Sequence, residues 1–390
     1  MNKKIVVLGA GIAGLSIARD LALRGFKITL IEKNTIGSGT TNKCAGMLHS
    51  GARYAIKDKD VAKLCFQENM ILRNIASFAV GKNDALFIIL PNDNKEYQKE
   101  FEESCKEINI PVKLLSQKES LELEPFLNAD ISGSYLTPDR VVDTYILVNS
   151  YVLALNQLNV NTIDNAEILK VTPTLSGWNL LLQKSNNEEE IYADYVINAT
   201  GNSLADTARL FNFDIDLVYI HGTMAVVDKK VSDRIISRCA PSATGDVIVP
   251  LVGLSLIGST WHELSHNVPI TMNEKDKLDI LNTGNKILDI SKNWSISDSF
   301  TGIRTHIKTN TDSGDFNVKR DYAIVEPNTT GIHNFISVLP GKLTIARFVA
   351  EKVGDIVSKN LDSYIPSVTA VTPLPEPTLN QENKFKFYVN

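Results

Sequence analysis

One short stretch of the sequence gathers residue types that could bind an anion and move a proton. The stretch AGMLHSGARYAIKD, residues 45–58, places His49, Arg53 and Tyr54 close together between glycines. An imidazole titrates near neutral pH and can take the proton of an alcohol. A guanidinium offers a planar fork for a phosphate or a carboxylate. The combination predicts the wall of an active site that oxidises a small anionic alcohol, with His49 as the base; a structural histidine is the alternative.

Three cations elsewhere in the chain fit the same chemistry. Arg304 and Arg320 lie near apolar or glycine-rich stretches, where an unpaired guanidinium would be costly. Lys342 stands at the start of a predicted helix, where its charge opposes the helix dipole, so an ammonium that faces a cofactor or a substrate would explain its position. Surface ion pairs and an exposed lysine are the alternatives, and an ion pair is favoured for Arg320, which stands between Lys319 and Asp321.

The chain opens with the glycine motif of a nucleotide-binding domain. Gly9, Gly11 and Gly14 form GxGxxG between an apolar strand and an amphipathic helix. The first glycine permits a tight turn, the second lets the backbone approach a pyrophosphate, and the third lets the helix pack on the strand. Glu32 ends the next strand, where a carboxylate can accept hydrogen bonds from ribose hydroxyls. The motif predicts a dinucleotide cofactor but does not separate NAD from FAD.

Two later segments favour FAD. VINATG, residues 196–201, is an apolar strand that ends in small residues and suits the back of a cofactor's ribityl and phosphate region. LPGKLT, residues 339–344, repeats the strand–glycine–helix arrangement, so a second helix N-terminus would stabilise the anionic reduced ring of a flavin. Each segment taken alone is equally an ordinary glycine turn.

Strand and helix signals alternate at both ends of the chain, around strand-rich inserts. This pattern predicts an α/β fold in which a Rossmann-like FAD-binding domain is interrupted by an inserted α+β substrate domain. The FAD-binding domain is expected to be discontinuous, over residues 1–85, 141–215 and 311–365, and the substrate-binding domain to comprise residues 86–140 and 216–310. Residues 366–390 turn to Pro, Thr and Asn and are expected to form a loosely ordered tail.

Composition limits the compartment and the partners. The 390 residues are 43% hydrophobic and 22% charged, which suits two globular domains. A formal net charge of −5 gives no overall attraction to nucleic acid or to anionic membranes. No apolar run reaches the roughly 18 residues of a membrane span, and the apolar start has the spacing of a nucleotide loop rather than of a signal peptide. The sequence therefore predicts a cytoplasmic protein without a transmembrane segment or a nucleic-acid partner.

No metal site is predicted. The cysteines are widely separated and form no CxxC pair, which is typical of buried thiols in a reducing compartment: Cys44, Cys65, Cys105 and Cys239. The remaining histidines share no metal-ligand spacing and are interpreted as surface or core residues: His221, His262, His266, His306 and His333.

Five segments follow one another along the chain in this order: VVLGAGIAGLSIARDLALRGFKITLIEK, GMLHSGARYA, TGIRTH, KRDYAIVE and GKLTIARFVAEKV. In this order the chain resembles the FAD-dependent glycerol-3-phosphate dehydrogenases, with most likeness to the large subunit of the anaerobic enzyme, over residues 3–375. The resemblance implies a glycine-oxidase-like flavoprotein fold. It also implies oxidation of the C2 hydroxyl of sn-glycerol 3-phosphate to dihydroxyacetone phosphate, with a hydride passed to flavin N5.

The same resemblance implies roles for individual residues. The residues expected to line the substrate pocket are Arg53, Tyr54, Arg304, Arg320 and Lys342. His49 occupies the position of the pocket histidine of related glycerophosphate oxidases, so His49, Arg304 and Lys342 are expected to be catalytic. The glycine motifs and the resemblance together predict cofactor contacts at Gly9, Gly11, Ile12, Ala13, Gly14, Glu32, Lys33, Thr40, Thr41, Gly46, Leu48, Ile168, Thr200, Gly201, Gly341, Lys342, Leu343 and Thr344.

Three departures from the family's pattern bear mainly on the electron acceptor. Pro340 replaces a glycine before the Gly–Lys pair and removes an N–H donor beside the flavin, and Thr305 replaces the usual proline after the pocket arginine. The sequence ends at Asn390, where the family's large subunit continues into a cysteine-rich domain thought to pass electrons onward. No such relay is expected among four scattered cysteines. The acceptor stays open between quinone, oxygen and a separate electron-acceptor protein.

Other functions of the same fold remain as alternatives. A 2-hydroxy-acid oxidase, for example one for 2-hydroxyglutarate, would also suit clustered arginines, as would an amino-acid oxidase. A non-catalytic flavin-binding subunit is the third alternative, and Pro340 is one of the features that favour it. A quinone acceptor would bring the protein to the inner face of the cell membrane, although no strongly basic amphipathic helix marks such a location.

Overall fold

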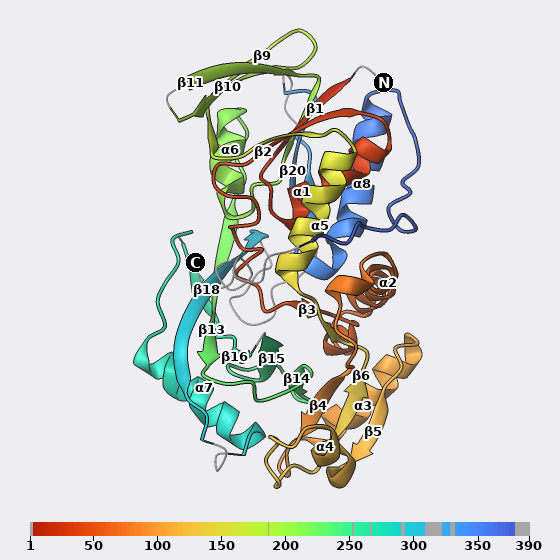
Figure 1. Ribbon diagram of the computed structural model, residues 1–390, viewed down its shortest axis with the longest axis vertical. Coiled ribbons are helices and arrows are strands. Elements are labelled where there is room, and N and C mark those ends of the chain that lie inside the picture. Colours follow the sequence, from red (N-terminus) through yellow and green to blue (C-terminus); the bar gives the residue numbers. More distant parts are fainter. Residues whose placement is uncertain are drawn as a thin grey trace.

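The structure is a computed structural model of the chain, and it describes residues 3–185, 187–251, 253–265, 267–289, 293–308, 322–327 and 332–378. Two sheets dominate the described residues (Figure 1). The sheet that contains the N-terminal strand occupies the upper part of the molecule in this view, and the larger sheet occupies the lower part. Arg320 and His266 lie outside the described residues.

The upper sheet is built around the N-terminal βαβ unit that the glycine motif predicts. Its strand order is β19-β20-β12-β1-β2-β8, and every neighbouring pair is parallel except β19 with β20. The bounds are β19 Ala323–Val325, β20 Phe335–Leu339, β12 Tyr195–Asn198, β1 Lys4–Leu8, β2 Lys27–Ile31 and β8 Asn161–Ile163. The apolar run of β1 alternates between two cores: Ile5 and Val7 face one, and Val6 and Leu8 face the other. A strand buried on both faces needs such a continuous apolar run.

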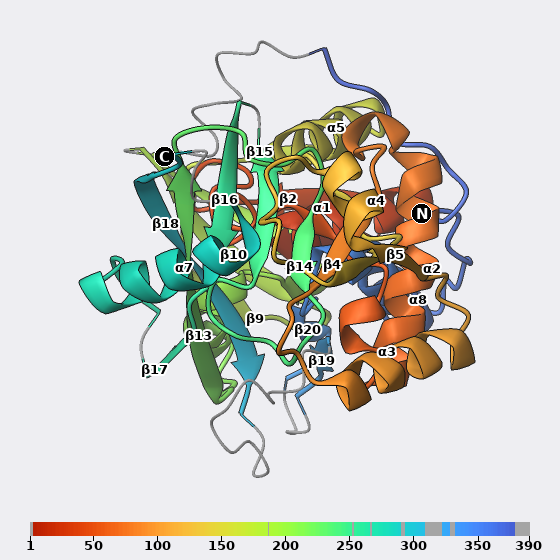
Figure 2. The same ribbon diagram turned by 90° about the horizontal axis from the view of Figure 1, so that it is seen from below.

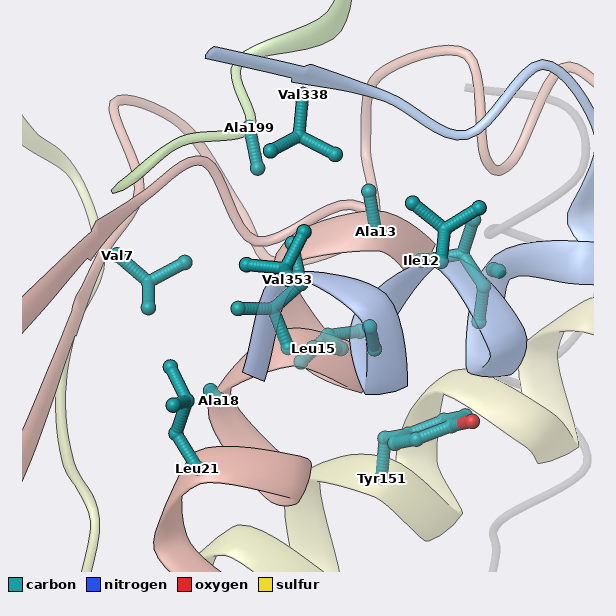
Figure 3. Close-up of a cluster of buried hydrophobic side chains, with 14 of the residues drawn as sticks. Val7, Ile12, Ala13, Leu15, Ala18, Leu21, Tyr151, Ala199, Val338 and Val353 are labelled. Carbon is teal, nitrogen blue, oxygen red and sulfur yellow. The ribbon is translucent and has the colours of Figure 1, made fainter. Parts of the chain in front are cut away.

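Helices cover the first face of this sheet. Helix α1 (Ile12–Leu23) packs between α5 (Thr144–Gln157) and α8 (Ala346–Asn360). Figure 3 shows Leu15 and Leu21 of α1 in the core that Tyr151 of α5 and Val353 of α8 complete. The other face is covered by an antiparallel sheet of β9 (Ala166–Pro173), β10 (Trp178–Lys184) and β11 (Asn187–Ala193) and by α6 (Leu204–Leu210).

The lower sheet has the order β17-β13-β16-β15-β14-β4-β6-β5, and β18 also pairs with β13. The bounds are β17 His262–Leu264, β13 Leu217–Val227, β16 Leu254–Gly258, β15 Val247–Leu251, β14 Ile236–Arg238, β4 Ala85–Ile89, β6 Gly133–Thr137, β5 Lys113–Ser116 and β18 Ile296–Ile307. Seen from below, α7 (Glu274–Ile287) lies on the side of β13 and β18, whereas α3 (Lys95–Glu107) and α4 (Gln117–Leu123) lie on the side of β4 and β5 (Figure 2). The side chains of Ser116 and Glu119 form a capping box at the start of α4.

Short elements between the two sheets position the stretch 45–58. The strand β3 (Met47–Leu48) pairs antiparallel with β7 (Arg140–Val141), so the residue after β3 lies beside the residue before β7. Helix α2 (Lys59–Ile75) begins at Asp58, whose side chain accepts a hydrogen bond from the amide of Val61. The α/β fold predicted from the alternation is confirmed.

The strands of the upper sheet all come from the three segments that the sequence assigns to the FAD-binding domain, and we keep the domain division as a proposal. Residues 366–378, the first half of the segment expected to be a loose tail, make hydrogen bonds with the rest of the protein. Arg19 donates to the carbonyl oxygen of Thr372 (2.8 Å), and the buried Leu374 donates its amide to Ile75 O (2.7 Å). Composition does not indicate this attachment, because residues distant in the sequence make it: Ser367 also donates to Asp20, and Thr369 accepts from Arg347. Residues 379–390 lie outside the described residues.

Candidate active site

A cavity of about 810 Å³ runs between the two sheets, within the range of about 300–1,000 Å³ that is usual for ligand sites. Most residues predicted to contact a cofactor or a substrate line it. These are Gly9, Gly11, Ile12, Ala13, Glu32, Lys33, Thr40, Thr41, Gly46, His49, Arg53, Tyr54, Ile168, Thr200, Gly201, Arg304, Gly341, Lys342 and Leu343. Backbone from the glycine motif forms one end of the cavity, and charged side chains from distant segments form the other.

The glycine end requires bare backbone. Gly9 has φ +92°, and a Cβ there would lie 2.6 Å from the carbonyl oxygen of Ala199. A Cβ on Gly14 would lie 1.8 Å from the carbonyl oxygen of Gly9, so the third glycine serves helix–strand packing and does not line the cavity. The carboxylate of Glu32 is held beside the loop, because it accepts the amides of Ala10 (2.7 Å) and Asn34 (2.9 Å).

These residues fit a flavin dinucleotide. The backbone at Gly9 and Gly11 is open to a pyrophosphate, and Glu32 lies on the wall where ribose hydroxyls are expected. The hydroxyl of Thr305 is a buried group in a residue of the cavity wall, and it has no hydrogen-bond partner among the described residues. A ligand that supplies a partner would remove the cost of that burial. The residues would therefore hold FAD.

The second glycine turn forms as predicted. After β20 comes Pro340, then Gly341 with φ +68°, and Lys342 caps a short 3₁₀ helix, Leu343–Ile345, that leads into α8. The Nζ atom of Lys342 lies 4.8 Å from the ring centroid of Tyr54. This cation–π contact holds the ammonium on the cavity wall, at a helix start that would otherwise disfavour a cation.

His49 is fixed on three sides. Its amide donates to the hydroxyl of Thr344 (3.0 Å), and its ring packs edge-on against Tyr54 with the centroids 5.4 Å apart. Its buried Nδ1 lies 3.4 Å from Oδ1 of Asp139, close enough for attraction but not aligned as a hydrogen bond. Burial lowers the pKa of the imidazole; Asp139 raises it, while Lys342 and Arg53 lower it further. The folded state therefore favours the neutral ring, which can accept a proton.

Asp139 is fully buried behind His49. Its carboxylate accepts the hydroxyl (2.6 Å) and the amide (3.2 Å) of Ser50 and the hydroxyl of Thr137 (3.2 Å). These neutral donors hold the carboxylate in place beside the imidazole. The pair of Asp139 and His49 is the arrangement of an oriented general base.

Arg304 comes to the cavity from the C-terminal half of β18, where it pairs in register with Ile220 of β13. Its Nη2 donates to the hydroxyl of Ser259 (2.7 Å), and its guanidinium lies 5.8 Å from the ring centroid of Trp261. A Cβ on Gly222 would lie 2.8 Å from the same Nη2. The missing side chain at position 222 therefore makes room for the guanidinium on the cavity wall.

Arg53 lies in the cavity wall, but its charge is matched by a carboxylate. Its Nη2 donates to both oxygens of Asp246 (2.9 and 2.8 Å), and its Nη1 donates to Ser237. Burial alone would lower the pKa of this guanidinium, but Asp246 more than offsets that effect and the pKa is raised. Asp246 already balances the charge of Arg53, and the substrate contact expected of Arg53 stays a prediction.

Three predicted cofactor contacts lie behind the wall. Gly14, Leu48 and Thr344 do not line the cavity; Leu48 is fully buried, and Thr344 supports His49. The sequence did not predict roles for Asp139, Asp246, Ser259 and Trp261, because no motif marks them.

The cysteines at 44, 65, 105 and 239 are all free, and three of them are buried. Over the described ranges, no three His, Cys, Asp or Glu side chains gather in a way that could hold a metal ion. Over the same ranges, no helix has both the length and the apolar character needed to cross a membrane.

Comparison with known proteins gives one consistent family. A family model described as FAD dependent oxidoreductase matches residues 4–335. A Haemophilus influenzae protein, one of the subunits of anaerobic glycerol-3-phosphate dehydrogenase, is 30% identical over 390 residues, covering 98% of this chain and 69% of that protein. The corresponding protein of Escherichia coli K12 is also 30% identical, over 383 residues, covering 96% and 70%.

Solved structures agree in fold. Glycine oxidase from Geobacillus kaustophilus superposes with a TM-score of 0.73 at 17% identity, covering 97% of this chain and all of that one. Glycerol-3-phosphate dehydrogenase from Bacillus halodurans, complexed with FAD, gives a TM-score of 0.72 at 20% identity, covering 96% and 68%. At these identities the likeness establishes the fold alone, which is the one predicted.

Proposed function

The chain belongs to the FAD-dependent oxidoreductases and, within them, to the family of these anaerobic glycerol-3-phosphate dehydrogenase subunits, and from this premise we propose that it oxidises sn-glycerol 3-phosphate to dihydroxyacetone phosphate. Its cofactor is FAD. One observation carries the proposal. The cavity that the glycine loop lines is also lined by His49, beside the buried carboxylate of Asp139, and by the cations of Arg304 and Lys342.

The proton of the C2 hydroxyl is assigned to His49. Because Nδ1 is buried against Asp139, Nε2 is the ring nitrogen that takes the proton. The carboxylate of Asp139 then stabilises the imidazolium that forms. The chemistry that FAD supplies when bound is acceptance of the C2 hydride at N5.

The phosphate is assigned to Arg304 and Lys342. A phosphomonoester carries nearly two negative charges, and a guanidinium fork with an ammonium provides charge-assisted donors for it. Ser259 and Trp261 hold the guanidinium on the cavity wall, so little side-chain freedom is lost when the anion binds. Arg320 remains a predicted third cation, outside the described residues.

An anaerobic titration tests this function. The FAD-loaded protein is mixed with sn-glycerol 3-phosphate while the visible absorbance of the oxidised flavin is followed, with 2-hydroxyglutarate and glycine as parallel additions. Bleaching by sn-glycerol 3-phosphate alone is the expected result. Bleaching by 2-hydroxyglutarate or glycine would mean that this compound, and not sn-glycerol 3-phosphate, is the substrate. A flavin that stays oxidised throughout would exclude the dehydrogenase function.

We further propose that the electrons leave to a separate partner protein, because the Haemophilus influenzae and Escherichia coli relatives are named as subunits of an enzyme. Reduced protein should then reoxidise slowly in air and slowly with a soluble quinone. Fast reoxidation by either compound would instead identify oxygen or quinone as the acceptor.

A further inference from the structure

Helix α2 places an asparagine directly beneath the base. Asn69 is fully buried, and its side-chain amide donates to two backbone carbonyls, those of Leu48 (3.1 Å) and Pro138 (3.2 Å). These carbonyls belong to the residues that immediately precede His49 and Asp139. One NH₂ group therefore ties together the two backbone segments that carry the base and its carboxylate.

Besides the two donors of Ser50 on Asp139, a short ladder joins the two segments. Strand β3 has two residues and pairs with β7, in the register Met47 with Val141 and Leu48 with Arg140. A ladder of this length is weak by itself. The donors from Asn69 act at the end of the ladder, where the chains turn toward the cavity.

Helix α2 is itself anchored to the other side of the site. Arg347 of α8 donates to both carboxylate oxygens of Glu68 (2.7 and 2.6 Å), the neighbour of Asn69. Both partners are buried, at 6% and 3% side-chain exposure, so the pair holds its geometry. Helix α8 follows the turn that carries Thr344, whose hydroxyl accepts the His49 amide. The backbone around His49 is therefore connected through Asn69 and α2 to α8, and from the turn before α8 back to the His49 amide.

Burial of the Asn69 side chain destabilises the fold, and the two contacts with the backbone carbonyls explain why an asparagine stands there. Its Oδ1 is buried and has no hydrogen-bond partner among the described residues. A buried, unsatisfied oxygen opposes folding, and an apolar residue at position 69 would avoid that cost. Aspartate has no donor when ionised, so the isosteric replacement cannot make either contact.

We propose that Asn69 is a positioning residue for the proposed reaction, which holds His49 against Asp139 through the backbone of the residues before them. The expected effect on kcat rests on the proposed function. The expected displacement of His49 does not, because it can be measured without a substrate.

The kinetic test is a double-mutant cycle on the FAD-loaded protein. Asn69→Ala should lower kcat by about three- to tenfold, no more than loss of the Asp139 carboxylate itself, with KM changed by less than about threefold. Asp139→Asn disrupts the same pair directly. Because both changes act on one pair, Asn69→Ala should have little further effect in the Asp139→Asn background. Effects that multiply in full would mean that Asn69 does not act through the pair, and the proposal would fail.

Two controls separate positioning from loss of stability. Ile75→Ala removes a buried side chain from the same helix, away from the site, and should lower the melting temperature while kcat stays within about twofold of wild type. Asn69→Asp keeps the size of the side chain and loses the donors; it serves as the second variant if Asn69→Ala fails to fold. Wild-type kcat in Asn69→Asp would overturn the proposal.

The geometric readout needs no substrate. The His49 imidazole is titrated by NMR in protein labelled at histidine, in wild type, both single variants and the double variant. Asn69→Ala and Asp139→Asn should each move the His49 pKa, and the double variant should titrate like Asp139→Asn alone. If wild type does not oxidise sn-glycerol 3-phosphate, only the proposed function fails. An unchanged His49 titration in Asn69→Ala rejects the positioning role whatever the substrate is.

Discussion

The two ends of the cavity are built in different ways. The nucleotide end comes from a single βαβ unit, and its critical features are backbone: the tight turn at Gly9, the contact of Gly14 with Gly9, and two amides on Glu32. The substrate end comes from segments far apart in the sequence, and its critical features are charges held by other side chains. Sterics govern the first end, and electrostatics and orientation govern the second.

The comparison implies that each end fails in its own manner. A backbone site loses its ligand when a carbon atom is added, because nothing can move aside in a close-packed turn. A side-chain site keeps its cofactor and its fold when one group is removed, and loses rate or affinity instead. Substitutions at the two ends therefore have distinct signatures, in cofactor retention at one end and in kinetics at the other.

Gly14→Ala should have the largest effect. The added Cβ would meet the Gly9 carbonyl oxygen at 1.8 Å, so the helix must separate from the strand. We expect loss of about 4 kcal/mol or more in the free energy of unfolding, together with loss of bound FAD. Denaturant unfolding and the FAD content after gel filtration measure both. The matched control is Gly81→Ala, whose Cβ would meet Val141 at an ordinary 3.5 Å. Full FAD retention in Gly14→Ala would refute the steric account of this end.

Arg304→Ala should act on kinetics alone. If the guanidinium binds the phosphate, its removal should cost about 2 kcal/mol or more of transition-state stabilisation. The kcat/KM for sn-glycerol 3-phosphate should then fall roughly 30-fold or more, while the FAD content stays normal. Arg234→Ala is a control of the same type, since Arg234 is a partly buried arginine just before β14 that pairs with Glu124 at the end of α4. Near-normal kinetics in Arg304→Ala would remove this residue from the anion site.

These two ends also differ in what the sequence could predict. The GxGxxG loop, Glu32 and the capping box of Ser116 with Glu119 are local, so spacing alone identifies them. The partners at the substrate end are distant: Ser50 is 89 positions from Asp139, and Arg53 is 193 positions from Asp246. The sequence predicted the cationic and basic residues of this end, but not the carboxylates that orient or neutralise them, since only the fold brings those together.

Asp139→Asn should change the pH dependence at the substrate end. Burial lowers the pKa of His49, and Asp139 raises it. Removing the carboxylate should therefore lower that pKa further, so the acid limb of kcat/KM moves to lower pH. The plateau of kcat should fall about tenfold, because the imidazole becomes a weaker base and its cation loses a partner. A pH profile of kcat/KM with unchanged flavin content measures this. An acid limb at the same pH as in wild type would mean that Asp139 does not affect the pKa of the base.

Trp261→Leu should have the smallest effect and gives the sharpest test of how the charge is held. The indole lies 5.8 Å from the Arg304 guanidinium, and such a contact contributes about 0.5–1 kcal/mol at a partly exposed site. We expect KM for sn-glycerol 3-phosphate to rise about two- to fivefold with kcat unchanged, because the ring orients the cation and touches no reacting atom. Trp261→Phe keeps an aromatic face and should lie between wild type and Trp261→Leu. Equal effects of the two variants would mean that the aromatic face of Trp261 does not matter for the charge. A fall in kcat would mean that Trp261 takes part in the chemical step.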